Sequence, residues 1–418
     1  MSDSQMPDED PEEWQGDFDP LADPEERRVV FAALDSFRQY RRHAHLNSTH
    51  RRRQAFYALP SGHWQMLSEA PFSILDHLNA VDDAIDVNAD IADAILAVAL
   101  DSFRLPANPD KDDPRQNWHD TATAADVNKA HSTIRQFYRD WSAEGQVERD
   151  VCYEPVKEFL LNEFAARRDE GEEVRVLVPG AGLGRFVFDL CIAGFHAEGN
   201  EISYHQLMAS SWVLNHTEGP GKHTLHPFAL QFSNLRSRQQ QLRSVAIPDN
   251  YPATAIKQVL DEVSRDAALH GSDSKVLMGS MTMTAADFVV CYRKSEYREL
   301  FGAVATVFFI DTAPNLIRYI ETIWHCLEPN GVWINVGPLL WHFEGRRHEN
   351  HQDRTDEAGI GEPGNVELTH EEVLALVSRM GFVVEEQAEE RTCGYIQDEE
   401  SMLLNKYRPV RWVARKKQ

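Results

Sequence analysis

Apolar residues recur at helical spacing through the first third of the chain. Asp23-Pro24 suits the start of a helix, because proline is well tolerated at the first helical position. The apolar positions after it share one helical face and are Val29, Val30, Ala33, Leu34 and Phe37. Ile85–Leu100 and Ser132–Trp141 have the same period, and Ser132 is the expected N-cap of the second helix. We therefore predict a helical region over residues 24–170.

A different pattern begins near residue 173, where short apolar runs alternate with helical stretches. The runs have the length of buried strands and are Val174–Val178, the segment near Ala197, Ala303–Ile310, Gly331–Val336, Phe382–Glu385 and Pro409–Ala414. Four helical stretches alternate with these runs. The first begins at Arg185, and the others are Tyr204–Leu214, Asn315–Leu327 and Glu371–Met380. This alternation predicts a mostly parallel sheet covered on both faces, a Rossmann-like α/β domain over residues 171–418. The last strand is expected to run antiparallel.

Three polar segments precede or interrupt this pattern. Residues 1–23 are acidic and rich in proline, and we expect a disordered tail rather than a signal peptide. Residues 236–282 and 344–366 are polar and mixed in composition, and we interpret them as surface insertions. No run of about 18 apolar residues occurs, so no membrane span is expected.

The chain is strongly acidic, with 42 basic and 67 acidic residues and a formal net charge of −25. This balance disfavours nucleic acid and anionic membranes as partners and is compatible with a neutral or cationic small substrate. The five cysteines are widely spaced and form no C-x-x-C pair, which favours a reducing compartment over a disulfide framework. We expect a cytoplasmic protein. The sequence leaves open whether it also enters the nucleus and whether it forms a homodimer.

A glycine-rich loop, Gly180-Ala-Gly182-Leu-Gly184, separates a predicted strand from a predicted helix. Glycines there let the backbone approach a ligand, and the start of the helix offers unpaired N–H groups. Glu201 ends the next strand, 21 residues after Gly180, where a carboxylate can accept hydrogen bonds from ribose hydroxyls. The alternatives are an ordinary glycine turn and an exposed glutamate. The G-x-G-x-G spacing and the absence of a P-loop lysine favour S-adenosylmethionine over NAD or ATP.

The position two before the first glycine, which is often acidic in methyltransferases, is Val178 in this chain. Another group must therefore hold the amino-acid end of the cofactor. Gln136 and Arg139 lie three residues apart on one face of the helix before the sheet, and Arg139 could pair with a carboxylate. The alternative is a solvated basic face.

Eight segments, in order along the chain, carry a resemblance to one known family. They are Gln136–Ser142, Glu148–Tyr153, Leu177–Arg185, Gly199–Glu201, Gln231–Asn234, Met283–Phe288, Phe308–Ala313 and Trp333–Phe343. In these segments the chain resembles carnosine N-methyltransferases over roughly two thirds of its length, from about Ile134 to Lys416. The resemblance implies methyl transfer from S-adenosylmethionine to the imidazole Nπ of carnosine, a histidine-containing dipeptide, giving anserine.

The resemblance also implies a set of cofactor contacts. These are Gln136, Arg139, Gly180, Glu201, Asp287, Phe288 and the backbone near Ala303, to which the loop itself adds Gly182. A carboxylate at Asp287 can accept from the adenine amino group while the Phe288 ring packs nearby. A helix N-cap followed by a core phenylalanine is an equally good interpretation of this pair.

The candidate acceptor site lies at the ends of two neighbouring strands. Asp311 directly follows the run Ala303–Ile310, and ligands of open α/β sheets bind at the carboxyl ends of strands. Capping of the next helix is the alternative role for Asp311. His342 follows the next strand. The resemblance implies that Asp311 faces the imidazole and that Tyr407, and more weakly Tyr395, contact the substrate; the family has a tyrosine where this chain has Asn405.

A mechanism follows from the chemistry of imidazole, in which only a ring nitrogen with a free lone pair can attack a methyl group. If Asp311 accepts the hydrogen on Nτ, Nπ becomes the nucleophile and the developing cation is stabilised. His342 would orient the ring. No metal is required, and we interpret His348–His351 as part of a solvated loop because it lacks the H-E-x-x-H spacing.

Three other functions remain open at this point. The first is methylation of another imidazole, in a histidine-containing peptide or a protein histidine. The second is a non-catalytic, cofactor-binding scaffold, against which the presence of both Asp311 and His342 argues. The third and most distant is a dehydrogenase.

Overall fold

The computed structural model describes residues 20–270, 278–344 and 364–417, and a seven-stranded sheet forms its centre. The strands, in the order in which they lie side by side, are β5 (Ser280–Ala285), β2 (His196–Glu201), β1 (Arg175–Pro179), β6 (Phe301–Val307), β7 (Leu327–Gly337), β9 (Val410–Lys416) and β8 (Phe382–Glu389). The first five are parallel, whereas β9 pairs antiparallel with both of its neighbours. The Rossmann-like sheet and its antiparallel last strand are thus confirmed.

Alternate residues of each central strand enter two different cores, as the two-residue period of a strand requires. In β1, Val176 and Val178 pack into a cluster with Val187, whereas Leu177 packs into a second cluster with Ile320. The helices of this domain are α9 (Arg185–Ile192), α10 (Tyr204–Asn215), α12 (Pro252–His270), α13 (Phe288–Tyr292), α14 (Leu316–Cys326) and α15 (His370–Arg379). The sheet is therefore buried on both faces.

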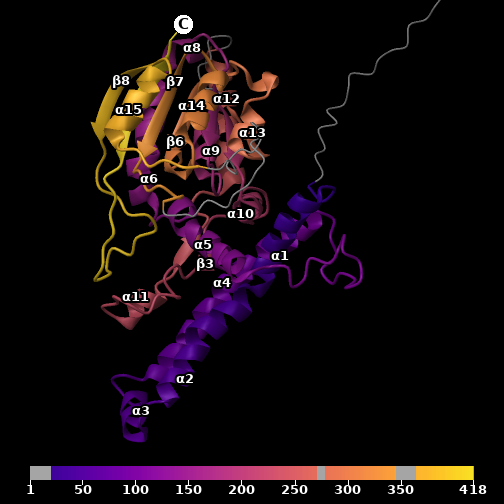
Figure 1. Cartoon of the computed structure of the whole chain (residues 1–418), viewed down its shortest axis with the longest axis vertical. Helices are drawn as coiled ribbons and strands as arrows, with labels where there is room; N and C mark the ends of the chain where they lie inside the picture. Colours follow the sequence, from indigo (N-terminus) through magenta and orange to yellow (C-terminus); the bar gives the residue numbers. More distant parts are fainter. Residues whose placement is uncertain (1–19, 271–277, 345–363, 418) are drawn as a thin grey trace, which may run out of the picture.

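A helical region precedes the sheet. Its elements are α1 (Pro24–His45), the π-helix Leu46–His50, α2 (Arg51–Tyr57), α3 (Ser61–Ser68), α4 (Ile74–Ser102), α5 (Ala124–Trp141), α6 (Gln146–Cys152), α7 (Glu154–Glu163) and α8 (Ala165–Asp169). Helices α1 and α4 lie side by side as a long arm that extends away from the sheet, with α2 and α3 at its far end (Figure 1).

Two helix starts in this region test the capping predictions. Asp23 caps α1, and its Oδ1 accepts a hydrogen bond of 2.7 Å from the N–H of Glu25, as expected. The prediction for Ser132 is wrong, because α5 begins eight residues earlier and Thr123 forms a capping box with Asp126. Ser132 lies inside the helix, so the helix that carries Gln136 and Arg139 is longer and better anchored than the sequence predicted.

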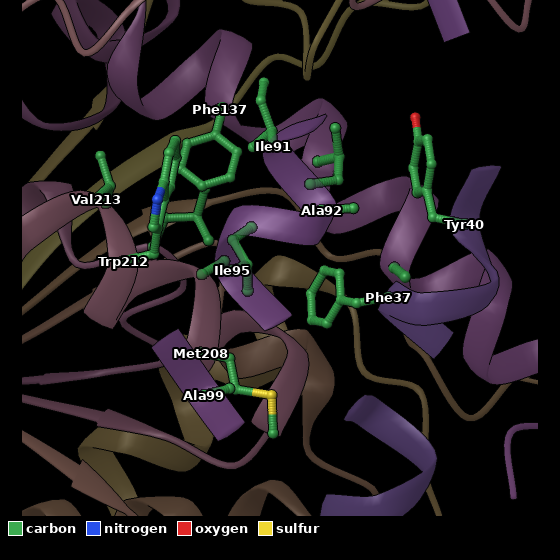
Figure 2. Close-up of a cluster of buried hydrophobic side chains, with 14 of the residues drawn as sticks. Phe37, Tyr40, Ile91, Ala92, Ile95, Ala99, Phe137, Met208, Trp212 and Val213 are labelled. Atoms are coloured by element: carbon green, nitrogen blue, oxygen red, sulfur yellow. The ribbon is translucent and has the colours of Figure 1, made fainter. Parts of the chain in front are cut away.

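The arm is joined to the sheet domain by a continuous apolar core. Figure 2 shows Phe37 of α1, Ile95 of α4, Phe137 of α5 and Trp212 of α10 in this cluster. The rings of Phe137 and Trp212 meet edge to face, with their centroids 5.4 Å apart. Because α10 follows β2 directly, this contact fixes α5 against the carboxyl end of the sheet.

The predicted insertions have different outcomes. Residues 236–282 contain α11 (Arg238–Leu242), strand β4 (Val245–Ile247), helix α12 and the start of β5; β4 pairs antiparallel with β3 (His223–Leu225). The segment therefore contributes secondary structure, including part of the edge strand of the main sheet. Residues 1–19 of the predicted tail and 345–363 of the second insertion lie outside the described residues. Within the described part of the chain, no helix is long and apolar enough to cross a membrane.

Candidate active site

A cavity of about 460 Å³ opens at the carboxyl ends of β1, β2 and β6. Strands β2 and β6 lie on opposite sides of β1, so the cavity occupies the point where the strand order reverses, the usual ligand position in open α/β sheets. Side chains from three strand ends, from α5 and from a loop near the C-terminus line it. They include Gln136, Arg139, Tyr153, Gly180, Gly182, Glu201, Phe288, Phe309, His342 and Tyr395.

The glycine-rich loop forms one wall of this cavity. Gly180, Gly182 and Gly184 have φ angles of 70°, 57° and 75°, in the left-handed region that glycine adopts without strain. A Cβ on Gly180 would lie 2.6 Å from Cδ2 of Phe309, whereas a Cβ on Gly182 would meet nothing within 4 Å. The loop thus needs glycine both for its backbone conformation and for its contact with the end of β6.

Glu201 ends β2 and is buried in the cavity wall beside the loop. Its Oε2 accepts a hydrogen bond of 3.0 Å from the N–H of Gly182, and its Oε1 accepts from the N–H groups of Ile202 and Ser203, both at 2.9 Å. Burial raises the pKa of Glu201, and these three hydrogen bonds oppose the rise. The carboxylate is therefore held rigidly at the cavity surface.

Gln136 and Arg139 reach the cavity from α5, as predicted. Nη2 of Arg139 donates to the hydroxyl of Tyr153 at 2.8 Å, and that hydroxyl donates to Asp140 at 3.0 Å. Burial disfavours the charge of Arg139, but Tyr153 and Asp140 outweigh it and hold the pKa of the guanidinium well above its ordinary value. A fixed cation therefore faces the cavity.

Tyr153 and Gln206 belong to the site although the sequence alone did not single them out. Tyr153 stacks on the ring of Phe186 at 4.8 Å and supports Arg139. The side-chain amide of Gln206 lies between Gln136 and Glu201. It is 2.9 Å from Oε1 of Gln136 and 3.0 Å from Oε2 of Glu201. Tyr153 closes one of the family-like segments, which was the available signal; no pattern in the sequence marks Gln206.

The structure brings one of the three remaining predicted cofactor contacts to the cavity. Phe288 lines it and packs edge to face on Phe309, with their ring centroids 5.4 Å apart. Asp287 caps α13, since its Oδ1 accepts from the N–H of Val289 at 2.8 Å. Ala303 lies inside β6, paired with Val176 and Val332, and the part of that strand that borders the cavity is Val307. Ala303 is thus too early in the strand to reach it.

Asp311 and His342 meet just beyond the ends of β6 and β7. Oδ2 of Asp311 accepts a hydrogen bond of 2.8 Å from the N–H of Leu340, and the Asp311 carbonyl oxygen accepts from the N–H of His342 at 3.0 Å. Asp311 is buried and His342 is exposed at the cavity rim. Burial raises the pKa of Asp311, against the effects of Leu340 N–H and the His342 side chain.

Two tyrosines, Tyr395 in the cavity lining and Tyr407 outside it, pack on the ring of Phe308. The ring of Phe308 packs on Tyr395 at 5.7 Å and on Tyr407 at 5.6 Å, and the Arg139 guanidinium lies 4.6 Å from the centroid of Tyr395. Backbone hydrogen bonds between Tyr407 and Cys393 hold the two halves of this loop together. Burial raises the pKa of Tyr407, and the negative charge of Asp311 adds to the rise. Of these four residues, His342 and Tyr395 line the cavity, whereas Asp311, which is buried, and Tyr407 are not part of its lining.

Among the described residues, no group of three or more His, Cys, Asp or Glu side chains is arranged to hold a metal ion. His348–His351 lies outside those residues. The groups at the cavity are a backbone loop and a guanidinium that can donate, a carboxylate that can accept, and aromatic rings, and together they suit an organic ligand with a carboxylate, hydroxyls and a flat ring.

Comparison with known proteins adds a family to this geometry. The sequence model of the carnosine N-methyltransferase family matches residues 116–418. A carnosine N-methyltransferase of Rattus norvegicus is 33% identical over 395 residues, covering 94% of this chain and 87% of the relative. One of Schizosaccharomyces pombe is 34% identical over 394 residues, covering 94% and 97%. Among solved structures, a methyltransferase of Methanosarcina mazei is 14% identical with a TM-score of 0.32, over 59% of this chain and 93% of that one.

Proposed function

The chain belongs to the carnosine N-methyltransferase family, and from that premise we propose that it methylates the imidazole Nπ of carnosine to give anserine. The enzyme is an S-adenosylmethionine-dependent methyltransferase. The single observation that carries the proposed acceptor is the buried carboxylate of Asp311 beside His342, at the same strand edge as the cavity that Glu201 and the glycine loop line.

The cavity fits S-adenosylmethionine, which supplies an electrophilic methyl group on a sulfonium when bound. The Gly180–Gly182 backbone offers a surface where a side chain at Gly182 would fill open space. Glu201 would accept from the ribose hydroxyls, and the fixed cation of Arg139 would pair with the carboxylate. Phe288 offers an apolar face for the adenine ring. At about 460 Å³, the cavity has the volume expected of a small-molecule site.

Asp311 would determine which nitrogen of the imidazole reacts. Its Oδ2 accepts from Leu340, so Oδ1 can accept the N–H of the substrate Nτ. That hydrogen bond fixes the tautomer with its lone pair on Nπ. As Nπ gains a methyl group the ring becomes cationic, and the buried carboxylate stabilises that charge. Loss of one proton to solvent then returns the ring to neutrality.

Three neighbouring side chains would keep the ring in position. His342 lies at the cavity rim, and its backbone is held to Asp311 by the 3.0 Å hydrogen bond. Tyr395 and Tyr407 pack on Phe308 and give aromatic surfaces at the same place. Holding Nπ in line with the methyl group supplies much of the rate in such a reaction, because the protein forms and breaks few bonds itself.

The test is a panel of acceptors incubated with purified chain and methyl-labelled S-adenosylmethionine, read by mass spectrometry. The panel contains carnosine, free histidine, a longer histidine-containing peptide and a histidine-bearing protein. We expect carnosine to be methylated with the highest kcat/KM, and Asp311→Ala to abolish turnover while cofactor affinity stays near that of the wild type. Preference for another acceptor, or near-normal turnover of Asp311→Ala, would reject the proposal.

A further inference from the structure

Two of the five cysteines are in contact close to the active-site cavity. Sγ of Cys152, the last residue of α6, lies 3.8 Å from Sγ of Cys393. Both are free thiols, and both are buried. They are 241 positions apart in sequence, so the fold alone brings them together. The thiols of Cys291 and Cys326 donate to oxygen atoms instead.

The two cysteines belong to a contact between α6 and residues 393–397. Helix α6 holds this segment at two points. At the first, the carboxylate of Glu148 accepts hydrogen bonds from two backbone N–H groups of the segment, each at 2.9 Å. The second is the sulfur contact between Cys152 and Cys393. Of these two points, the second can become covalent when thiols are oxidised.

Each cysteine is close in sequence to a residue that contacts Arg139. Tyr153 directly follows Cys152, and its hydroxyl accepts a hydrogen bond of 2.8 Å from Nη2 of Arg139. Tyr395 lies two residues after Cys393, and its ring centroid is 4.6 Å from the guanidinium. Arg139 and both tyrosines line the cavity. Because a protein interior is densely packed, a change in the distance between the two sulfur atoms would be transmitted to Arg139.

The two thiols differ in acidity. The hydrogen bond between them lowers the pKa of Cys393; burial and the negative charge of Glu148 oppose this effect, and the positive charges of Arg139 and Lys406 support it. The same hydrogen bond and burial raise the pKa of Cys152. Cys393 therefore ionises more readily, and the thiolate is the form that reacts with oxidants. It lies in the irregular segment between β8 and β9, where a small oxidant needs only a local opening of the chain.

We propose that Cys152 and Cys393 form a reversible disulfide that weakens the binding of S-adenosylmethionine. The oxidant is a peroxide. The thiolate of Cys393 attacks one oxygen of hydrogen peroxide and breaks the O–O bond, which gives a sulfenic acid and hydroxide. The sulfur of Cys152 then displaces hydroxide from the sulfenic acid and forms the S–S bond. One proton from each thiol converts the two hydroxides to water, and a dithiol reductant reverses the reaction.

The bond would change the geometry at the cofactor's carboxylate. The two sulfur atoms must approach from 3.8 Å to about 2.0 Å. Helix α6 and residues 393–397 then move closer together, which shifts Tyr153 and Tyr395 against Arg139. Since Arg139 is the expected partner of the carboxylate, misplacing this charged donor should raise the Kd for S-adenosylmethionine about 10-fold.

The test treats the full chain with hydrogen peroxide and measures linkage and cofactor binding on the same sample. The intact mass should fall by that of two hydrogen atoms, and peptide mapping should find Cys152 linked to Cys393. Isothermal titration should show the Kd for S-adenosylmethionine rise about 10-fold and return with dithiothreitol. In Cys152→Ser and Cys393→Ser, peroxide should leave the Kd at the value of the same variant when reduced. The matched control, Cys291→Ser, removes another buried cysteine and should respond as the wild type does.

Three outcomes would overturn the inference. The first is a peroxide-treated wild type without the linkage, and the second is the linkage with an unchanged Kd. The third is a loss of cofactor affinity that persists in both serine variants, because another oxidised residue would then be responsible. If one serine variant does not fold, as judged by circular dichroism, the other variant and the mapped linkage decide. These measurements involve no methyl acceptor, so failure of the proposed acceptor would leave this inference unaffected.

Discussion

The backbone N–H of His342 donates a hydrogen bond of 3.0 Å to the carbonyl oxygen of Asp311. Asp311 lies just after β6 and His342 follows β7, and these strands are parallel neighbours. The hydrogen bond therefore ties two segments together at the carboxyl edge of the sheet, where Oδ2 of Asp311 is also held by the N–H of Leu340. A carboxylate and an imidazole that are 31 positions apart in sequence are in this way kept at one place.

Asp311→Asn should separate activity from stability. Burial raises the pKa of Asp311, so the folded chain holds a proton there more tightly than the unfolded chain. The stabilising contribution of this group is present below its ordinary pKa and is lost as the pH rises through the raised pKa. At neutral pH the wild type therefore carries a buried charge that asparagine lacks. We expect kcat to fall about 100- to 1,000-fold and the midpoint of thermal unfolding at pH 7.5 to stay equal or rise.

Thermal unfolding and steady-state kinetics of the same preparation check this prediction. The difference in stability between Asp311→Asn and the wild type should shrink as the pH falls through the raised pKa of Asp311, because both side chains are neutral below it. A clearly lower midpoint of thermal unfolding for the variant at pH 7.5 would show that the carboxylate stabilises the fold. That result would contradict the view that the buried charge destabilises the fold and serves activity.

Gly180→Ala should be more destabilising than substitution of a glycine whose only requirement is its backbone conformation. An alanine at φ +70° costs about 1–2 kcal/mol, and the clash of its Cβ with Phe309 adds about 1–3 kcal/mol. Gly171 also has a positive φ, of 78°, but no atom within 4 Å of a Cβ, so Gly171→Ala pays only the first cost.

Urea unfolding of the two glycine variants gives the comparison, and a binding assay gives the consequence for the site. Gly180→Ala should also weaken S-adenosylmethionine binding, because movement of Phe309 alters the cavity wall, while Gly171→Ala should bind it normally. Equal stability of the two variants would mean that the loop can shift without cost.

Tyr395 should act through its ring more than through its hydroxyl. Tyr395→Phe keeps the stacking on Phe308 and the contact with the Arg139 guanidinium and loses only a long hydrogen bond of 3.3 Å from Gln136. For Tyr395→Phe we expect little change in the Kd for S-adenosylmethionine or in the KM for carnosine. Tyr395→Ala should raise the Kd for S-adenosylmethionine and the KM for carnosine, since a cation–π contact is worth about 0.5–2 kcal/mol. Isothermal titration and initial rates distinguish the two variants, and equal losses would assign the role to the hydroxyl.

The affinity for S-adenosylmethionine should decrease in acid because of Glu201. The carboxylate of Glu201 can accept hydrogen bonds with both oxygens when it is ionised. Burial raises the pKa of Glu201 above the ordinary value of 4.5. As the pH falls through that raised pKa, Glu201 gains a proton and one oxygen can no longer accept. Isothermal titration of the wild type over this range should show the affinity for S-adenosylmethionine decrease. Glu201→Gln should bind S-adenosylmethionine more weakly at neutral pH, and its affinity should not decrease further in acid. If the affinity of the variant still decreases in acid as that of the wild type does, another group is responsible for the pH dependence.

The sequence predicted the parts of the site that depend on local pattern. The glycine loop, Glu201 at the end of β2 and Asp311 after β6 all lie where strand ends were expected, because a buried strand followed by glycine or a carboxylate has a clear signature. The antiparallel β9 was also predicted. These features need only the period of the apolar residues and the chemistry at the end of each run.

Contacts between distant segments were not predictable in the same way. The strand β5, whose residues are Ser280–Ala285, lies at the edge of the sheet and is only half-buried, so its sequence lacks the Val and Ile run of a central strand. Gln206 of α10, and Tyr153, which directly follows α6, enter the site because α10 and α6 pack against α5. The wrong N-cap at Ser132 is a different case, because Thr123 with Asp126 three residues later is a local capping signal that the sequence does contain.

The central claim is that Asp311 directs the methyl group to one of two imidazole nitrogens. The most direct test is NMR assignment of the product formed from carnosine and ¹³C-methyl S-adenosylmethionine by the full chain. We predict a single product in which the labelled methyl is on Nπ, with Asp311→Asn forming it far more slowly. A product labelled on Nτ, or a mixture of both isomers, would contradict the account.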